Sequence, residues 1–74
     1  MMTESEYLKG EPLTLREQEI AVATTRGLTN KQIGAELGIS PETVKRHLAS
    51  IYAKLSLHGR VALAIHVIRT GLAA

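Results

Sequence analysis

The 74-residue sequence contains no cysteine, no tryptophan and no phenylalanine, and it has only two tyrosines and two prolines. Without cysteine the chain can form neither a disulfide framework nor a thiolate metal site, which fits a reducing compartment. No apolar run approaches the roughly 20 residues of a membrane-spanning helix, and no signal peptide is visible. These absences exclude disulfide-rich secreted proteins and membrane proteins, and we expect a cytoplasmic protein.

Residues typical of catalytic or metal sites are equally sparse. The three histidines, His47, His58 and His66, have spacings that match no metal-ligand pattern. No nucleophile motif is present, and a domain of this size has little room for a substantial pocket. The sequence therefore predicts no metal, no cofactor and no enzymatic activity.

Composition and charge favour a small globular domain that binds a polyanion. Apolar residues make up 45% of the chain, enough for one modest core. The formal net charge is only +2, but five of the seven acidic residues precede position 20. From Lys31 onward six Lys and Arg residues face only two Glu residues, an excess that suits an anionic partner such as nucleic acid.

Two helix starts lie close together near the middle of the chain. Thr29 and Gln32 have the S/T-x-x-E/Q spacing of a capping box, and Ser40 followed by Pro41 is a second typical start. Between them Gly38 can take the left-handed conformation that ends a helix. This pattern predicts a helix-turn-helix, whose second helix is the usual element placed in the DNA major groove.

The remaining signals complete an all-α prediction. Thr14 with Glu17 starts an earlier helix, and Gly71 ends a later one. We expect a four-helix helix-turn-helix domain over residues 13–74, with helices at about 15–26, 30–37, 41–55 and 60–70. Residues 1–12 are polar and acidic, and we interpret them as a flexible N-terminal segment or a linker remnant.

The helix over 41–55 has one apolar stripe and one outer face. The stripe consists of Val44, Leu48, Ile51 and Leu55. Arg46 lies almost opposite the stripe, with Lys45 on one flank. The outer face is therefore small or basic near its middle, which lets a helix lie deep in a groove.

The last helix has more apolar surface than one small core needs. We expect one buried face, formed by Val61, Ala64, Ile65, Ile68 and Leu72. Leu63 and Val67 lie on a different side, and this surplus points to a homodimer contact, with core packing under the N-terminal segment as the alternative.

Four motifs together resemble the LuxR-type helix-turn-helix domain of bacterial regulators, over residues 13–72. The family's opening L-T-x-R-E-x-E-V appears as LTLREQEI at 13–20, and its S-N-K-E-I-A as TNKQIG at 29–34. The pattern I-S-x-x-T-V-K-x-H is intact at 39–47, and K-L-G-V-x-x-R appears as KLSLHGR at 54–60. Gly34 replaces an Ala of the family, and Ser56 replaces a Gly, which predicts a strained or differently shaped turn there.

The resemblance implies a set of DNA-contacting residues. Base contacts are implied for Lys45 and Arg46, with Ala49 at the groove floor. Phosphate contacts are implied for Asn30, Lys31, Thr43, His47, Ser50 and Lys54. For Lys54 an ion pair with Glu17 or Glu19 is an alternative, and His47 borders the core, so packing there is an alternative too.

The implied function is sequence-specific binding of double-stranded DNA by a transcriptional regulator in the bacterial cytoplasm and nucleoid. We expect a homodimer through the C-terminal helix, with Leu63, Val67 and Thr70 at the contact. A receiver or sensor domain outside this chain and RNA polymerase are further expected partners, and no membrane is expected. A sigma-factor end domain and a protein-interaction module are alternatives, but a fourth helix argues against the first and the basic outer face against the second.

Overall fold

The helices begin at the side-chain caps that the sequence predicts. In the computed structural model, which describes residues 1–71, the Thr14 hydroxyl accepts the Glu17 backbone N–H at 3.1 Å, and Glu17 accepts the Thr14 N–H at 2.8 Å. Thr29 and Gln32 make the same pair of bonds, at 3.1 and 2.8 Å. Ser40 accepts the backbone N–H of Thr43 at 3.1 Å, with Pro41 at the first helical position. The three predicted starts are therefore confirmed.

The order of elements is α1 (Glu4–Leu8), α2 (Leu15–Thr24), α3 (Asn30–Leu37), α4 (Pro41–Leu55) and α5 (Arg60–Thr70), and residues 1–71 contain no strand. The all-α prediction and its four helices are confirmed, with α2 ending at Thr24 instead of about residue 26. Within residues 1–12, predicted to be flexible, the structure adds a short helix, α1, capped by Thr3.

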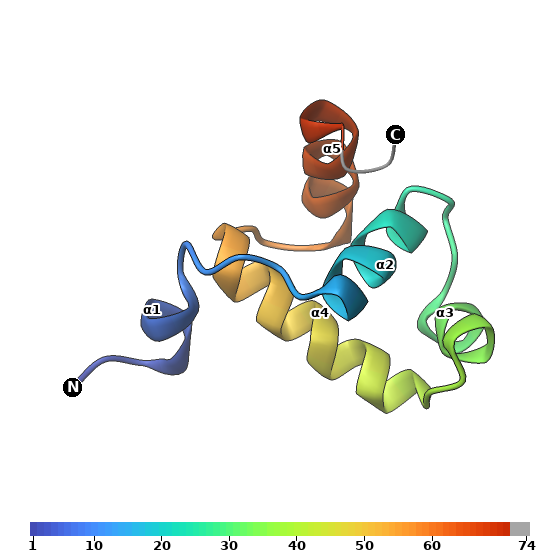
Figure 1. Cartoon of the computed structure of the whole chain (residues 1–74), viewed down its shortest axis with the longest axis horizontal. Helices are drawn as coiled ribbons and strands as arrows, with labels where there is room; N and C mark the ends of the chain where they lie inside the picture. Colours follow the sequence, from blue (N-terminus) through green and yellow to red (C-terminus); the bar gives the residue numbers. More distant parts are fainter. Residues whose placement is uncertain (72–74) are drawn as a thin grey trace.

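The longest helix, α4, connects the other elements. Figure 1 shows α3 beside the first part of α4 and α1 beside its last part, while α2 lies against both α4 and α5. The fully or almost fully buried apolar residues come from α2, α3, α4 and α5: Ile20, Ala21, Ala23, Ile33, Val44, Leu48, Ile51, Leu63 and Val67. The predicted stripe of α4 thus lies at the centre of the core, and the opposite face of α4 therefore points to solvent.

The two apolar faces of α5 are exchanged relative to the prediction. Leu63 and Val67 are fully buried, so the prediction that these two side chains contact a second molecule is wrong. Val61, Ile65 and Ile68, predicted to be buried, are 75%, 46% and 66% exposed. Both faces are apolar, and packing against α2 selects the one with Leu63 and Val67. Leu72, also assigned to the buried face, lies outside the described residues.

The turn between α3 and α4 depends on two glycines. Gly38 has a φ of 71°, in the left-handed region that glycine adopts without strain, and Ile39 N–H donates to Gly34 C=O at 3.0 Å. A Cβ at Gly34 would lie 2.5 Å from the Ile39 carbonyl oxygen. Gly34 therefore lets the turn pass unusually close to α3, which sets how α4 departs from it.

The end of α4 contains a strained residue, as the replacement of glycine predicted. Ser56 has φ 54° and ψ 44°, and it is the one non-glycine residue with positive φ in residues 1–71. A side chain in this left-handed region costs roughly 1–2 kcal/mol.

We expect Ser56→Gly to raise the free energy of unfolding by about 1 kcal/mol, because glycine removes the Cβ strain. Urea unfolding followed by circular dichroism measures the change. The matched substitution Ala53→Gly, in the regular helical backbone of α4, should lower the free energy by about the same amount. Destabilisation by both substitutions would contradict the strain at Ser56.

Candidate nucleic-acid interface

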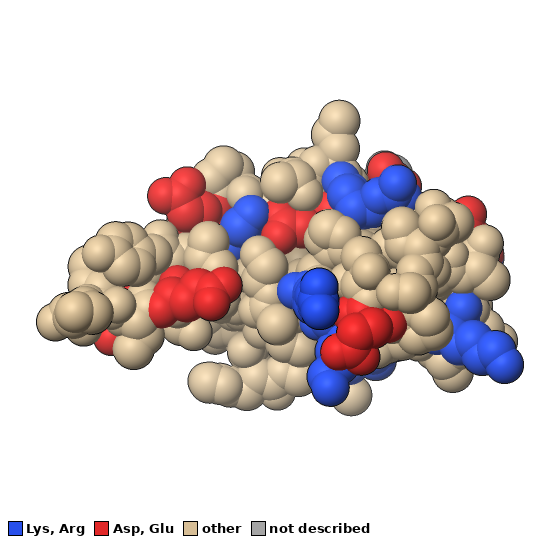
Figure 2. Space-filling model, turned by 90° about the horizontal axis from the view of Figure 1, so that it is seen from below, with Lys and Arg blue, Asp and Glu red and all other residues tan. Residues whose placement is uncertain are grey.

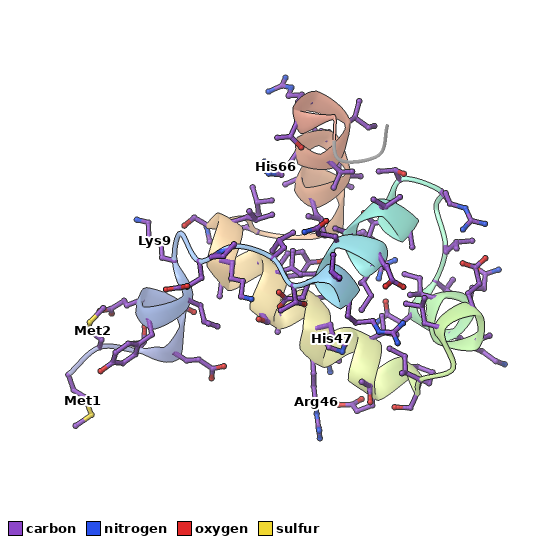
Figure 3. All side chains as sticks on the ribbon, in the orientation of Figure 1. Met1, Met2, Lys9, Arg46, His47 and His66 are labelled. Carbon is purple, nitrogen blue, oxygen red and sulfur yellow. The ribbon has the colours of Figure 1, made fainter. Side chains whose placement is uncertain are left out.

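The outer face of α4 presents the predicted base-reading side chains to solvent. Lys45, Arg46 and Ala49 are all exposed, on the side opposite the buried stripe of Val44 and Leu48. Figure 3 shows Arg46 pointing away from the body of the protein. Because Ala49 is small, it leaves room for the long side chains of Lys45 and Arg46 to reach into a groove.

Charge is divided along this side of the molecule. Figure 2, seen from below, shows acidic side chains at the left, where α1 lies, and most of the Lys and Arg side chains in the middle and at the right, with acidic side chains among them in the middle. The exposed cations of this side include Lys31 on α3 and Lys45 and Arg46 on α4. Acidic Glu4 and Glu6 belong to α1. The helix-turn-helix thus carries exposed cations, although Glu36 on α3 and Glu42 on α4 are exposed there as well.

The start of α3 is held by an arginine of α5. The Arg60 guanidinium donates to the Leu28 carbonyl oxygen at 2.6 Å and to the Asn30 side-chain oxygen. With its oxygen engaged, the Asn30 amide keeps its N–H groups for another acceptor. Lys31, next in the chain, is exposed, and the first backbone N–H groups of a helix favour an anion. Asn30 and Lys31 thus form one donor-rich corner.

Two residues implied as phosphate contacts have a different partner. Glu17 accepts from Lys54 Nζ at 2.6 Å and from the Ser50 hydroxyl at 2.7 Å. The side chains of Lys54 and Glu17 are only 10% and 4% exposed. The alternative of an ion pair between Lys54 and Glu17 is therefore the one observed, and we leave Ser50 and Lys54 out of the proposed DNA contacts.

The Glu17 carboxylate is held in its charged form. Burial, the largest single influence, raises its pKa, but the hydrogen bonds from Lys54, the Thr14 backbone and Ser50, with the charge of Lys54, together lower the pKa from 4.5 to about 2. This buried anion joins the start of α2 to the second half of α4. It therefore fixes the orientation of the helix that carries Lys45 and Arg46.

The remaining predicted site residues are Thr43, His47 and Thr70, and they differ in exposure and in the helix that holds them. Thr43 is half-buried, with its hydroxyl 2.9 Å from the Ser40 hydroxyl at the start of α4. His47 is half-buried, consistent with its position beside the core stripe. Thr70 is exposed, and its hydroxyl donates to the His66 carbonyl within α5 at 2.9 Å. Thr43 and His47 can join the α3–α4 surface, whereas Thr70 belongs to α5.

Sequence reasoning assigned no role to Arg60 and gave the ion pair of Glu17 with Lys54 only as an alternative to a phosphate contact. The sequence did hold a signal for the role of Arg60. A cation in the first turn of a helix interacts unfavourably with the helix dipole, which suggests that Arg60 binds a partner outside its own helix. Glu17 was interpreted as a capping residue and as one possible ion-pair partner of Lys54. The hydrogen bond that it accepts from Ser50 was not predicted, although one carboxylate can accept several bonds. Both residues position α3 and α4 without being on the exposed face.

Two other kinds of site find no support in the described part of the chain. Residues 1–71 contain no group of three His, Asp or Glu side chains that could hold a metal ion. Among the same residues no helix is long and apolar enough to cross a membrane.

Comparison with known proteins gives one consistent result. The sequence matches the family GerE, described as "Bacterial regulatory proteins, luxR family", over residues 11–67. It is 50% identical over 58 residues to the "Probable transcriptional regulatory protein SgaR" of Hyphomicrobium methylovorum, covering 77% of this chain and 28% of that protein. The transcriptional regulatory protein UhpA of Escherichia coli is 44% identical over 54 residues, covering 73% and 28%.

A third relative, the transcriptional regulatory protein LiaR of Bacillus subtilis, is 43% identical over 65 residues, covering 88% of this chain and 31% of LiaR. The chain thus spans about a third or less of the length of these relatives. No solved structure shows a significant match.

Proposed function

The chain belongs to the luxR family of bacterial regulatory proteins, whose helix-turn-helix domains bind DNA, and we propose that it reads a specific double-stranded sequence by placing α4 in the major groove. The observation that best supports this proposal is the exposed outer face of α4, where Lys45 and Arg46 lie near the small residue Ala49. Lys and Arg are the commonest readers of guanine O6 and N7, and alanine can contact a thymine methyl group.

The proposed phosphate contacts surround this base-reading face. Asn30 and Lys31 supply donors from the start of α3, and Thr43 lies in the first turn of α4. His47 is a further candidate, because it borders the outer face while remaining half-buried. Such contacts fix register and orientation on the duplex, whereas the base contacts carry the sequence information.

We also propose that the protein binds as a homodimer through the outer face of α5. Val61, Ile65 and Ile68 are exposed on one helix, and Thr70 lies near its end. A row of exposed aliphatic side chains is typical of a surface that a second molecule covers. Two copies would place two α4 helices on half-sites separated by roughly 34 Å or a multiple of it.

Ile68→Glu should weaken dimerisation by about tenfold or more while leaving the domain folded, because a carboxylate cannot be buried at the contact without a partner. Sedimentation velocity, with and without a bound duplex, measures the assembly. Val67→Glu, one position earlier, should instead abolish the helical circular dichroism signal, since Val67 is fully buried. An unchanged dimer of Ile68→Glu would reject this face of α5 as the contact.

Because the relatives are much longer than this chain, we propose that a receiver or sensor domain in the same regulator controls this output domain. RNA polymerase is the expected downstream partner of a transcriptional regulator. The proposed location is the bacterial cytoplasm, on the nucleoid, where the DNA is.

Selection from a randomised duplex pool, at low and at physiological salt, tests the proposed function. Enrichment of a two-fold-symmetric site is the expected result for a dimeric sequence reader. Salt-sensitive binding with no enriched sequence would leave only non-specific attraction to phosphate, and sequence reading would then be rejected.

A further inference from the structure

The short N-terminal helix lies against the face of α4 that the proposed function places in DNA. One cavity between the two helices, of about 400 Å³, is lined by Glu4, Ser5 and Leu8 of α1. Its opposite wall consists of residues from the outer face of α4: Arg46, Ala49, Ser50 and Ala53. A second cavity places Ser5, Glu6 and Lys9 across from Ala49, Tyr52 and Ala53. Thus α1 borders the last two turns of the outer face.

This position conflicts with deep insertion of α4 into DNA. An α-helix with its side chains is about 10–12 Å across, and the major groove of B-DNA is about 12 Å wide. The groove therefore accepts α4 alone, and α1 beside Ala49 and Ala53 would meet the bases or the backbone. In Figure 1 α1 projects from the left side of α4, clear of α2 and α3, so it would be among the first parts to reach the duplex.

The charge of α1 opposes DNA as well. Glu4 lines the same cavity as Arg46, and Glu6 lines the second cavity. Lys9, the residue that follows α1, lines the second cavity as well, so it offsets only one of the two carboxylates. A phosphate backbone approaching Arg46 would therefore meet a carboxylate at the same place, which weakens the attraction.

The contact is also weak enough to be reversible. α1 has five residues and no fully buried side chain, and Leu8 is its one half-buried residue. A helix this short is not stable alone in water, so α1 stays helical mainly while it contacts α4. Its link to the domain is held by the Gly10 N–H donating to the Lys54 carbonyl at 2.8 Å and by Lys54 Nζ donating to the Pro12 carbonyl at 3.2 Å. These bonds keep α1 close even when it leaves α4.

We propose that α1 is an autoinhibitory element, which covers the second half of the outer face of α4 and must leave it before the protein can bind its DNA site. This inference rests on the proposed function, because it assigns α4 to the major groove. Duplex DNA and α1 then compete for one surface. If α1 is in place in about nine of ten molecules, the apparent affinity for DNA is reduced about tenfold.

A reversible crosslink tests the proposal in the full chain. The chain has no native cysteine, so Ser5→Cys with Ala53→Cys introduces a single thiol pair across the α1–α4 cavity. We expect the oxidised protein to bind DNA at least about tenfold more weakly than the same protein after reduction. Equal affinity of the two forms would overturn the proposal, and so would failure of the cysteines to crosslink under oxidant. Each single cysteine variant, treated with the same oxidant, is the control.

A second variant releases α1 without a crosslink. Leu8→Ser should strengthen DNA binding about three- to tenfold, because Leu8 is the one half-buried residue of α1 and lines the cavity against α4. Tyr7→Ser is the matched control, since Tyr7 is 65% exposed and lines neither cavity, and its affinity should equal that of the wild type. Weaker or unchanged binding by Leu8→Ser would overturn the proposal.

The outcomes separate this proposal from the proposed function. If the wild type binds DNA, and neither the crosslink nor Leu8→Ser changes its affinity, autoinhibition is rejected and DNA reading stands. If no variant binds any duplex, including Leu8→Ser with α1 released, the proposed function is rejected and autoinhibition with it.

Discussion

Replacing Glu17 with alanine is expected to lower the free energy of unfolding by about 3–5 kcal/mol, because Lys54 would remain buried without its anionic partner. The substitution also removes the acceptor of the Ser50 hydroxyl and of the Thr14 backbone N–H. Domains of this size are only marginally stable, so a large fraction of the variant should be unfolded at 37 °C. Urea or thermal unfolding followed by circular dichroism measures the loss.

The matched control is Glu19→Ala, on the same helix. Glu19 forms an exposed ion pair with Arg16 at 3.4 Å, with side chains 53% and 41% exposed, and such pairs contribute about 0–1 kcal/mol. If both substitutions lowered the free energy of unfolding equally, the buried network around Glu17 would stabilise the fold no more than an exposed ion pair does.

The same network predicts a dependence on pH. The pKa of Glu17 is about 2 in the folded protein and near its ordinary value of 4.5 in the unfolded chain. The unfolded state therefore binds the proton first, and the stabilisation is complete above about pH 5 and lost as the pH falls toward 2. The gap between the two pKa values corresponds to about 3 kcal/mol. The Glu17→Gln variant should lose much less free energy of unfolding than the wild type as the pH falls from 5 to 2. If the variant lost as much as the wild type, other carboxylates would be responsible for the acid-induced loss.

Replacing Arg46 with alanine should weaken binding to the selected operator by about 1–3 kcal/mol, or roughly 5- to 150-fold, and relax specificity at one base position. The reason is that Arg46 points away from the body of the protein from the outer face of α4, where a base edge would lie. Competition binding against duplexes with each base substituted measures the specificity profile.

Lys31→Ala is the control for the Arg46 experiment, because Lys31 lies at the start of α3 and is proposed to contact a phosphate. It should weaken binding to all duplexes alike and reduce the salt slope by about one. If Arg46→Ala also weakened every duplex equally, Arg46 would be a phosphate contact and not a base reader.

The bounds of α3, α4 and α5 could be predicted because their signals are local. Thr29, Ser40 and Gly38 act on backbone groups within a few positions, so their effect does not depend on the rest of the fold. The outer face of α4 followed from the buried stripe of Val44 and Leu48, since a helix has only one side opposite its core.

Elements that depend on distant partners were not predicted, except that an ion pair of Lys54 with Glu17 or Glu19 stood as an alternative to a phosphate contact. Lys54 and Ser50 lie on flanks of α4 that rotation alone assigns to solvent, but Glu17, more than 30 positions earlier, turns them into a buried network. In α5 two aliphatic faces compete, and only the space left by α2 decides between them. For α1 the Thr3–Glu6 pair had the spacing of a capping box, but without an apolar period it was not recognised.

The arginine that begins α5 also has a mechanical consequence. Arg60 is hydrogen-bonded to Leu28 and Asn30, so α5, the proposed dimer helix, is attached directly to the start of α3, which is proposed to contact phosphate. A dimer built on α5 would therefore hold its two DNA-reading helices at a fixed distance and angle. Inserting one base pair between the half-sites displaces one by about 3.4 Å and rotates it by roughly a tenth of a turn. The spacing of the operator would then be as selective as its sequence.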